Sequence, residues 1–456
     1  MKKALLLTIA GLLTAVGMTT AQTAKQVGGD ISLLTKYETN GTKYYDLEGN
    51  AITDMLGYFK TQGLNAMRVR LFVAPGNATA SEKDNGVVQD LDYVKALGKR
   101  IKDAGFSLML DFHYSDTWAD PAKQWTPKDW LTLTDEQLYT KIYDYTKEAL
   151  QAMKDAGATP DFIQTGNEIS YGMLWGEGII TKNTESETTY QASSTTYKRY
   201  DASQTANRTR FTTLLKKAGE ACREVCPQAK IILHTERVPS ASYLNNFYTD
   251  MNDAGVDYDI IGLSYYPYYH GNLAQLETSL NTLETNFAEK EIMIVETGYY
   301  YAWQPTISSP GVNLAGTYPI SPEGQQAFTK ALIGQLKGHT KVVGLYWWMM
   351  EASESGLDWS TKRVTRDWYN ASLFNDNEKV SGKDGITYNY PAGKAMPALG
   401  ELKSFLDGDN TGIRGINADS RSLPSDGWYT LDGRRLAGRP TVKGIYINNG
   451  RKVVVK

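Results

Sequence analysis

The segment LDYVKALGKRIKDAGFSLMLDF, residues 91–112, decides the fold class. Apolar residues recur at helical spacing over Leu91–Ala104, which predicts an amphipathic helix. Gly105 follows the helix, as expected because glycine readily adopts the left-handed conformation that ends a helix. The next run, Ser107–Phe112, is short and mostly apolar, which indicates a buried strand. Residues 91–112 therefore contain one helix, one glycine stop and one strand.

This unit recurs from about residue 28 to residue 406. Strands are predicted for eight runs: Asp30–Leu34, Ala66–Val73, Ser107–Phe112, Phe162–Thr165, Ile231–His234, Ile260–Leu263, Ile292–Val295 and Val342–Tyr346. Further helices are predicted for Tyr143–Ala156, Phe211–Val225 and Gln325–Leu336, and Gly63 and Gly255 occupy the same place as Gly105. Alternating strands and helices indicate a parallel sheet. Eight such units predict an α/β fold, a (β/α)8 barrel, with long loops after its strands at 169–206, 297–322 and 351–393. A doubly wound open sheet is the alternative, but it calls for a glycine-rich phosphate turn that the chain lacks.

Both ends of the chain depart from this pattern. Lys2 and Lys3 precede the apolar run Ala4–Met18, and small residues follow, which predicts a signal peptide over residues 1–21. The catalytic domain is expected at 22–407. Residues 408–456 are expected to form a linker and a short β-rich appendage. Their end resembles the C-terminal sorting tails of exported Bacteroidetes proteins. We expect a protein exported from a Gram-negative bacterium, with no membrane span.

The composition narrows the class of partner. The chain has 456 residues, and 48 basic against 51 acidic side chains give a net charge of −3. This balance does not favour a nucleic acid or a membrane surface. The chain has 30 Tyr and 10 Trp but only 11 Phe, which suits an extended polar ligand that stacks on rings. Cys222 and Cys226 lie four residues apart, so either a strained disulfide or two free thiols fits the sequence.

Two glutamates carry the predicted chemistry. Glu168 follows the fourth predicted strand and Glu296 follows the seventh. In a closed parallel barrel the carboxyl ends of all strands meet at one rim, so the two carboxyl groups are expected to face each other there. Glycoside hydrolysis needs two carboxyl groups on opposite sides of the scissile bond, and if they lie about 5 Å apart, one attacks the anomeric carbon and the other protonates the leaving oxygen.

The chain resembles glycoside hydrolase family 53, the endo-β-1,4-galactanases, over residues 28 to about 406. The matching segments are GGDISLL (28–34), YYDLEGN (44–50), GLNAMRVRLFVAP (63–75), DFHYSDTWADPAKQ (111–124), TGNEI (165–169), GLSYYPYYHG (262–271), VETGYY (295–300), YPISPEGQ (318–325) and NASLFND (370–376). The HYSDTWADP and SYYP stretches are specific for this family, whereas the Asn-Glu pair indicates only the larger clan of retaining barrels. The resemblance implies endo-hydrolysis of β-1,4-galactan with retention of configuration.

The resemblance also implies residue roles. Glu168 matches the acid/base and Glu296 the nucleophile. Asn167 matches the residue that binds the sugar 2-hydroxyl, and Arg70 matches the arginine beneath the nucleophile, where its charge keeps Glu296 ionised. Tyr265 or Tyr266 matches the tyrosine that hydrogen-bonds the nucleophile, and the sequence leaves open which one.

Further residues are expected around the sugar. Asp111 and His113 are expected to line the wall of the site, His113 as a neutral hydrogen-bonding group. Trp347 matches a tryptophan at the floor of the site. Trp118 and Trp175 are candidate stacking platforms, with burial in the loop core as the alternative. A metal site of His113, His234 and His270 is disfavoured, because their spacing fits no ligand pattern.

Some features depart from the family or leave alternatives open. The family typically continues Glu-Pro after Trp347, whereas this chain continues Trp348-Met349-Met350, which puts the outer wall of the site in doubt. The loop after the seventh strand lacks the acidic calcium loop of some bacterial members. No cofactor is expected to be required, and structural calcium is not predicted. We expect a monomer acting on a polysaccharide. Mannan or glucan is the alternative substrate, and a non-catalytic glycan-binding barrel is the alternative class.

Overall fold

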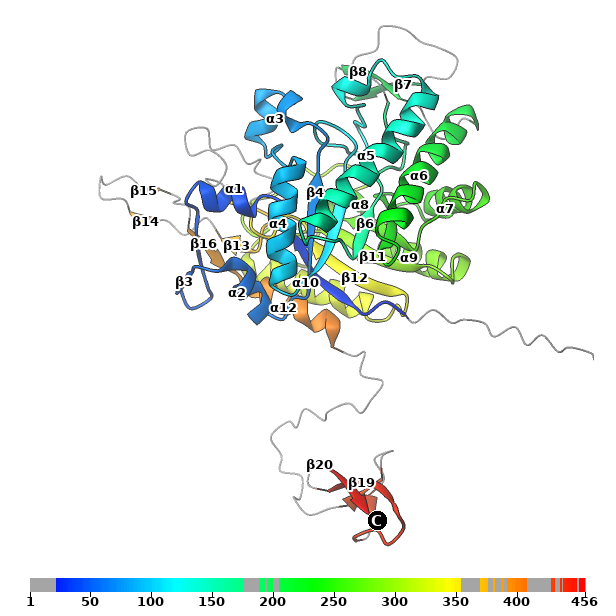
Figure 1. Cartoon of the computed structure of the whole chain (residues 1–456). Coiled ribbons are helices and arrows are strands. Elements are labelled where there is room, and N and C mark those ends of the chain that lie inside the picture. The colour runs from blue at the N-terminus through cyan, green and yellow to red at the C-terminus, as the bar shows by residue number, and fades with distance from the viewer. Residues whose placement is uncertain are drawn as a thin grey trace, which may run out of the picture. The chain divides into compact units, whose positions relative to one another are not determined.

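The computed structural model is a closed eight-stranded parallel barrel surrounded by helices, as predicted (Figure 1). The structure describes residues 22–175, 188–192, 195–199, 205–353, 370–375, 380–381, 387–388, 392–407, 428–430, 435–436, 438–448 and 451–455. The predicted signal peptide, the tail linker and parts of the long loops lie outside these residues. Among the described residues, no helix is long and apolar enough to cross a membrane.

The barrel strands follow the chain in order around the barrel: β1 (Gln26–Asp30), β4 (Ala66–Leu71), β5 (Ser107–Phe112), β6 (Phe162–Gln164), β9 (Lys230–Thr235), β10 (Ile260–Tyr265), β11 (Glu291–Thr297) and β12 (Val342–Trp347). Strand β12 pairs with β1 in parallel and closes the barrel. The last seven strands overlap the predicted runs.

The first strand was predicted too late in the chain. Asp30–Leu34 was expected, whereas β1 is Gln26–Asp30 and Leu34 already begins helix α1 (Leu34–Thr39). Gly28 and Gly29 lower the apolar content of β1, so the apolar pattern did not indicate a strand there. A Cβ atom at Gly28 would lie 1.7 Å from the carbonyl oxygen of Ala66, so the neighbouring strand leaves room only for glycine.

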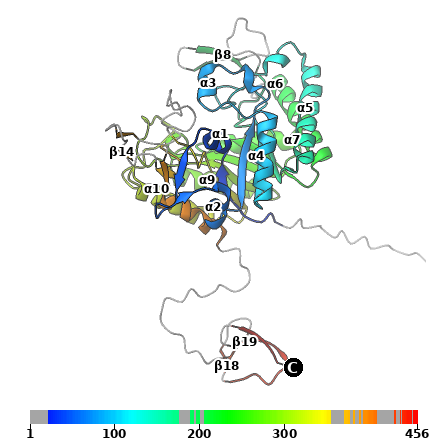
Figure 2. The same ribbon diagram turned by 60° about the vertical axis from the view of Figure 1, so that its left-hand side comes forward.

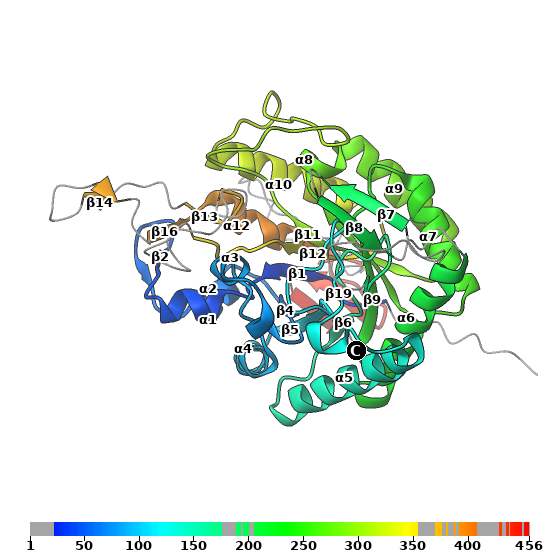
Figure 3. The same ribbon diagram turned by 90° about the horizontal axis from the view of Figure 1, so that it is seen from above.

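A ring of helices covers the outside of the barrel, as the view from above shows (Figure 3). The helices that follow α1 are α2 (Met55–Thr61), α3 (Ala80–Asp84), α4 (Leu91–Asp103), α5 (Asp135–Asp155), α6 (Thr205–Val225), α7 (Ala241–Asp253), α8 (Pro267–His270), α9 (Leu273–Asn286), α10 (Pro322–Leu336) and α12 (Pro397–Leu402). Helix α4 packs on the outer faces of β4 and β5 (Figures 1 and 2). Its buried residues Val94, Leu97 and Ile101 form one stripe, and the side chain of Asp90 caps its first turn.

The remaining strands form small sheets outside the barrel. One of these sheets has the strand order β13-β16-β2-β3. Its strands are β2 (Lys43–Tyr45), β3 (Ala51–Ile52), β13 (Phe374–Asn375) and β16 (Ala392–Ala395). Two hairpins pair β7 (Thr188–Ala192) with β8 (Thr195–Arg199), and β14 (Val380–Ser381) with β15 (Thr387–Tyr388).

The chain divides into two compact units, Met1–Asp407 and Gly408–Lys456. The second unit contains a four-stranded sheet in the order β18-β17-β19-β20. Its strands are β17 (Trp428–Tyr429), β18 (Arg435–Leu436), β19 (Gly444–Asn448) and β20 (Arg451–Val455).

The barrel interior changes from apolar to polar along its axis. Near the start of the strands, Ala66, Met109 and Phe162 belong to an apolar cluster. Because side chains on one face of a strand recur every second residue, the next inward positions on these strands are Arg68, Asp111 and Gln164, all buried. The alternation therefore places buried polar groups directly beneath the carboxyl-terminal rim, where barrel enzymes hold their active sites.

Candidate active site

A cleft of about 640 Å³ opens at the carboxyl-terminal rim of the barrel. Both predicted catalytic residues, Glu168 and Glu296, line it. The other lining residues are Trp118, Ala119, Asp120, Pro121, Ala122, Lys123, Asn167, Tyr171, Glu236, Arg237, Pro239, Tyr266, Tyr268, Tyr269, His270, Tyr300, Pro310 and Trp348. This volume lies in the range of ordinary ligand sites.

Glu168 is held by an unusual backbone turn after β6. Its own φ is 46°, in the left-handed region, and Gly166 has a φ of 116°. A non-glycine residue in this region is strained, and such strain is tolerated mainly where it places a functional group. Gln124 Nε2 donates to the carbonyl oxygen of Asn167 at 2.7 Å, which secures the turn from the neighbouring loop.

The surroundings of Glu168 favour its protonated form. Burial raises the pKa of Glu168 well above its ordinary value, and the nearby charge of Glu296 adds to the rise. A hydrogen bond from Ser264 acts in the opposite direction. Nδ1 of His234 lies 3.3 Å from the backbone N–H of Glu168, and its Nε2 lies 2.8 Å from Ser264 Oγ. With Nδ1 as acceptor, the ring proton lies on Nε2 and Ser264 can turn its own proton toward Glu168.

Glu296 lies on β11, is 4% exposed and has two partners that favour its charged form. Tyr266 Oη donates to its Oε2 at 2.8 Å, and Arg68 Nη2 forms an ion pair with its Oε1 at 2.9 Å. The pKa of Glu296 is raised to about 7, because the rise caused by burial exceeds the lowering caused by Arg68 and Tyr266. Arg68 and Tyr266 stabilise the carboxylate of Glu296, whereas burial and the charge of Glu296 disfavour a charged Glu168, so the surroundings favour Glu296 as the ionised member of the pair.

The structure resolves the choice between the two tyrosines. Tyr265 Oη donates to the carbonyl oxygen of Gly271 at 3.2 Å and is fully buried. Tyr266, the residue directly after β10, is the tyrosine bound to Glu296. Its backbone is still extended, and because successive residues of an extended backbone point to opposite faces, only one of the pair faces the barrel axis.

The prediction that Arg70 lies beneath Glu296 is wrong. Arg68 makes that contact, and it also pairs with Asp30 at 3.1 Å and Asp111 at 2.8 Å. Arg70 pairs with Asp30 at 3.0 Å and lies over the ring of Trp118, 4.4 Å from its centroid. Both arginines point from β4 into the barrel. Arg68 lies deeper in the barrel than Arg70, and its extended side chain contacts Glu296.

Asp111 and His113 lie beneath the cleft and are not among the described residues that line it. His113 Nδ1 accepts from the backbone N–H of Ala119 at 3.0 Å, and its Nε2 lies 3.1 Å from Asp111 Oδ2. Burial lowers the pKa of His113, so the ring is neutral and carries its proton on Nε2. These residues support the rim instead of forming its wall.

Asn167 lines the cleft and is fixed on two sides. Its Nδ2 donates to the carbonyl oxygen of Ala119 at 2.8 Å, and its Oδ1 accepts from Arg68 Nη2 at 2.9 Å.

Of the three predicted tryptophans, Trp118 lines the cleft, whereas Trp175 and Trp347 do not. Trp175 is fully buried and packs edge-on against Trp125, with ring centroids 5.9 Å apart, so it belongs to the loop core. Trp347 is also fully buried, and its Nε1 donates to the carbonyl oxygen of Ala371 at 2.7 Å. Its neighbour Trp348 lines the cleft instead, at the position where the chain departs from the family pattern.

Several cleft residues were missed from the sequence. Glu236 and Arg237 follow β9 directly, so the position of strand ends could have revealed them. Tyr268, Tyr269 and Tyr300 form an aromatic side of the cleft, with the rings of Tyr268 and Tyr300 4.4 Å apart. The GLSYYPYYHG segment contains the first two, but helix α8 decides that they turn toward the cleft.

The described residues contain no group of three or more His, Cys, Asp or Glu side chains that could hold a metal ion. His270 Nδ1 accepts from the backbone N–H of Tyr266 at 3.1 Å, whereas His113 and His234 serve the separate contacts described above. Cys222 and Cys226 are buried free thiols.

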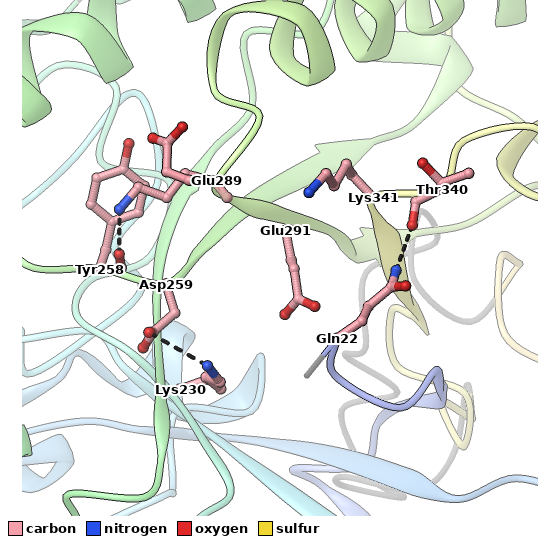
Figure 4. Close-up of a pocket in the computed structure, with 9 residues that line it drawn as sticks. Gln22, Lys230, Tyr258, Asp259, Glu289, Glu291, Thr340 and Lys341 are labelled. Carbon is pink, nitrogen blue, oxygen red and sulfur yellow. Dashed lines mark hydrogen bonds and ion pairs between the residues drawn. The ribbon is translucent and has the colours of Figure 1, made fainter. Parts of the chain in front are cut away.

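A smaller crevice of about 310 Å³ lies at the opposite end of the barrel, where the strands begin (Figure 4). Two of its lysines have partners close by. Lys290 donates to the carbonyl oxygen of Tyr258 at 2.7 Å, and Lys230 lies 3.7 Å from Asp259. Charges at this end of such a barrel serve stability, because the loops that carry chemistry follow the strands.

A (β/α)8 barrel with two carboxyl groups in one cleft, at the ends of its fourth and seventh strands, is typical of a retaining glycoside hydrolase. The model of glycosyl hydrolase family 53 matches residues 26–382. The chain belongs to glycosyl hydrolase family 53.

Named relatives agree with this assignment. An arabinogalactan endo-beta-1,4-galactanase from Cellvibrio japonicus is 30% identical over 397 residues, 83% of this chain and 94% of that protein. Another, from Thermothelomyces thermophilus, is 30% identical over 332 residues, 70% of this chain and 88% of that protein. The solved GH53 catalytic domain of Ignisphaera aggregans superimposes with a TM-score of 0.66 at 30% identity, covering 83% of this chain and 95% of that domain.

Proposed function

We propose that this enzyme hydrolyses internal β-1,4-galactosidic bonds of galactan or arabinogalactan, with retention of configuration. The observation that carries the proposal is the pair Glu168 and Glu296, which line one cleft in different electrostatic surroundings. The names of the relatives from Cellvibrio japonicus and Thermothelomyces thermophilus support galactan as the polymer.

In the proposed first step, Glu296 attacks the anomeric carbon while Glu168 gives its proton to the leaving oxygen. The glycosidic bond breaks, a galactosyl ester of Glu296 forms, and the remainder of the chain leaves as an alcohol. Arg68 and Tyr266 hold the attacking carboxylate ionised and oriented. Asn167 is proposed to bind the 2-hydroxyl of the attacked sugar, a contact that strengthens as positive charge develops on the ring.

In the second step, Glu168 takes a proton from water, and the hydroxide oxygen displaces Glu296 from the anomeric carbon. Two displacements restore the original configuration, and both carboxyl groups return to their starting state. This chemistry needs no cofactor, because the two carboxyl groups supply the nucleophile, the acid and the base.

The same proposal covers the setting of the enzyme. We propose that residues 1–21 are removed as a signal peptide, that the protein is exported, and that it acts as a monomer. The barrel unit carries the activity, and the β-rich tail serves export or attachment.

The first test is to incubate the protein with β-1,4-galactan, β-1,4-mannan and a soluble β-1,4-glucan, and to separate the products over time. A ladder of galacto-oligosaccharides from galactan alone is expected, with products released first in the β-configuration. Turnover of mannan or glucan without galactan would replace the proposed substrate and leave the catalytic pair in place.

A matched pair of variants tests the residue roles. Glu168→Gln and Glu296→Gln should each lower kcat by a factor of about 10³ or more, since each step needs both carboxyl groups. Glu289→Gln, an exposed residue at the opposite end of the barrel, is the control. Full activity of Glu168→Gln would refute its assignment as the acid/base.

A further inference from the structure

Glu236 is a third carboxyl group of the cleft that the proposed reaction does not use. It follows β9, lines the cleft and is 5% exposed. Its Oε2 accepts a hydrogen bond from Ser170 Oγ at 2.6 Å. Its Oε1 is buried and has no hydrogen-bond partner among the residues that the structure describes. An unsatisfied buried acceptor is costly, and its presence in a native site calls for an explanation such as a ligand.

The next residue, Arg237, offers the complementary group. Its guanidinium carbon lies 5.4 Å from the ring centroid of Tyr171 and 5.1 Å from that of Tyr243, so two rings hold it in place. Its Nε is buried and, within the described part of the chain, has no hydrogen-bond partner. Two adjacent residues that line the cleft therefore have unused hydrogen-bonding capacity, an acceptor on Glu236 and a donor on Arg237.

The two groups are held before any ligand arrives. Ser170 fixes the carboxyl group of Glu236, and Tyr243 Oη donates to the carbonyl oxygen of the same Ser170 at 2.6 Å. Tyr171, the next residue, contacts Arg237 and itself lines the cleft. The segments after β6 and β9 thus brace each other, and a preorganised pair loses little freedom on binding.

The position of the pair indicates which sugar it meets. Strand β9 lies beside β6, whose loop carries Glu168, whereas Glu296 lies two strands away from β9 on β11. An acid that protonates the leaving oxygen stands on the side of the leaving sugar. Glu236 and Arg237 therefore border the leaving-group end of the cleft.

We propose that Glu236 and Arg237 recognise the sugar unit on the leaving-group side of the scissile bond by bonding two neighbouring hydroxyl groups of its ring. The carboxyl group accepts from one hydroxyl, and the guanidinium Nε–H donates to the oxygen of the next. This inference rests on the proposed function for the direction of the chain. It assigns these residues to specificity, and neither residue touches the anomeric carbon.

The test compares substrates that differ only in the leaving group. The leaving group of galactotetraose is a sugar. The leaving group of phenyl and 4-nitrophenyl β-1,4-galactobiosides is a phenol, which offers no sugar ring to Glu236 and Arg237. Glu236→Gln and Arg237→Lys should each lower the ratio of kcat/KM for galactotetraose to kcat/KM for the phenyl galactobioside about 10- to 100-fold, the effect of losing a hydrogen bond to a charged group. Glu289→Gln is the matched control, and thermal unfolding shows that each variant is folded.

The two aryl substrates separate recognition from an effect on proton donation. If Glu236 acted only through Glu168, its loss would slow the phenyl substrate, which needs an acid, much more than the nitrophenyl substrate. That result, or an unchanged ratio for either variant, would overturn the inference. If the wild type does not cleave galactan but cleaves another polymer, the proposed substrate is wrong. The inference about Glu236 and Arg237 is then tested with the ratio of kcat/KM for an oligosaccharide of that polymer to kcat/KM for its phenyl glycoside.

Discussion

Removing the hydroxyl group of Tyr266 should raise the pH at which the enzyme becomes active. In Tyr266→Phe, Glu296 loses the hydrogen bond that it accepts at 2.8 Å and keeps its ion pair with Arg68. A hydrogen bond to a charged group contributes about 1.5–3 kcal/mol. At about 1.4 kcal/mol for each pKa unit, the pKa of Glu296 should rise by about 1–2 units.

The sign follows from the charge that the hydroxyl group stabilises. Tyr266 stabilises the carboxylate, so without it Glu296 keeps its proton to a higher pH. Activity requires the carboxylate, and the acidic limb of the profile of kcat/KM against pH should therefore move upward by about 1–2 pH units. The basic limb, which reports Glu168, should move less.

The chain contains a matched control one residue away. Tyr265→Phe removes a hydroxyl group that donates to the carbonyl oxygen of Gly271 and does not touch Glu296. The acidic limb of this variant should stay in place, even if its free energy of unfolding falls by about 1 kcal/mol. The reasoning is refuted if both variants shift the limb equally, or if Tyr266→Phe shifts it to lower pH.

Three further predictions concern the rest of the site and the core. Arg68→Lys should move the acidic limb of the kcat/KM profile to higher pH and lower kcat/KM about 100-fold, because it weakens the ion pair with Glu296. Arg70→Lys should leave that limb in place. Profiles of kcat/KM against pH for both variants test this contrast. Trp348→Ala should lower kcat/KM for galacto-oligosaccharides about ten-fold through a higher KM, and steady-state kinetics with unchanged kcat would distinguish lost stacking from damaged chemistry. Reductant should not change the Tm of the wild type, because Cys222 is a free thiol, whereas Cys222→Ala should lower the unfolding free energy by about 1–2 kcal/mol in thermal or denaturant unfolding.

The sequence predicted the strands that consist of apolar runs rich in β-branched residues. Ser107–Phe112 was placed to the residue. The first strand escaped because close contact with its neighbour requires Gly28, so the feature that makes the strand fit the barrel also removes its apolar signal. Some helix starts were predicted several residues too late, because the first turn of the helix is polar and lacks the apolar periodicity. Helix α5, for example, begins at Asp135, directly after the N-cap Thr134, which forms a capping box with Gln137.

The errors in the site arose within pairs of identical residues that lie one or two positions apart in the sequence. Arg68 and Arg70 are both inward positions of one strand, and Trp347 and Trp348 are neighbours at the end of another. Local pattern cannot choose within such pairs. The choice depends on side-chain reach and on the segments packed above the strand ends, such as the backbone of Ala371 that accepts from Trp347.

The sequence by itself determined the barrel and the two carboxyl groups at its rim, because strand periodicity and position along a strand are local properties of the chain. Only the tertiary structure decided which arginine, tyrosine and tryptophan of each pair reaches the cleft. It also brought Glu236 and Arg237 beside Glu168, since strands β6 and β9 are separated in sequence but paired in the barrel. Their unused hydrogen-bonding groups became visible only there, because burial and the absence of a described partner are properties of the folded chain.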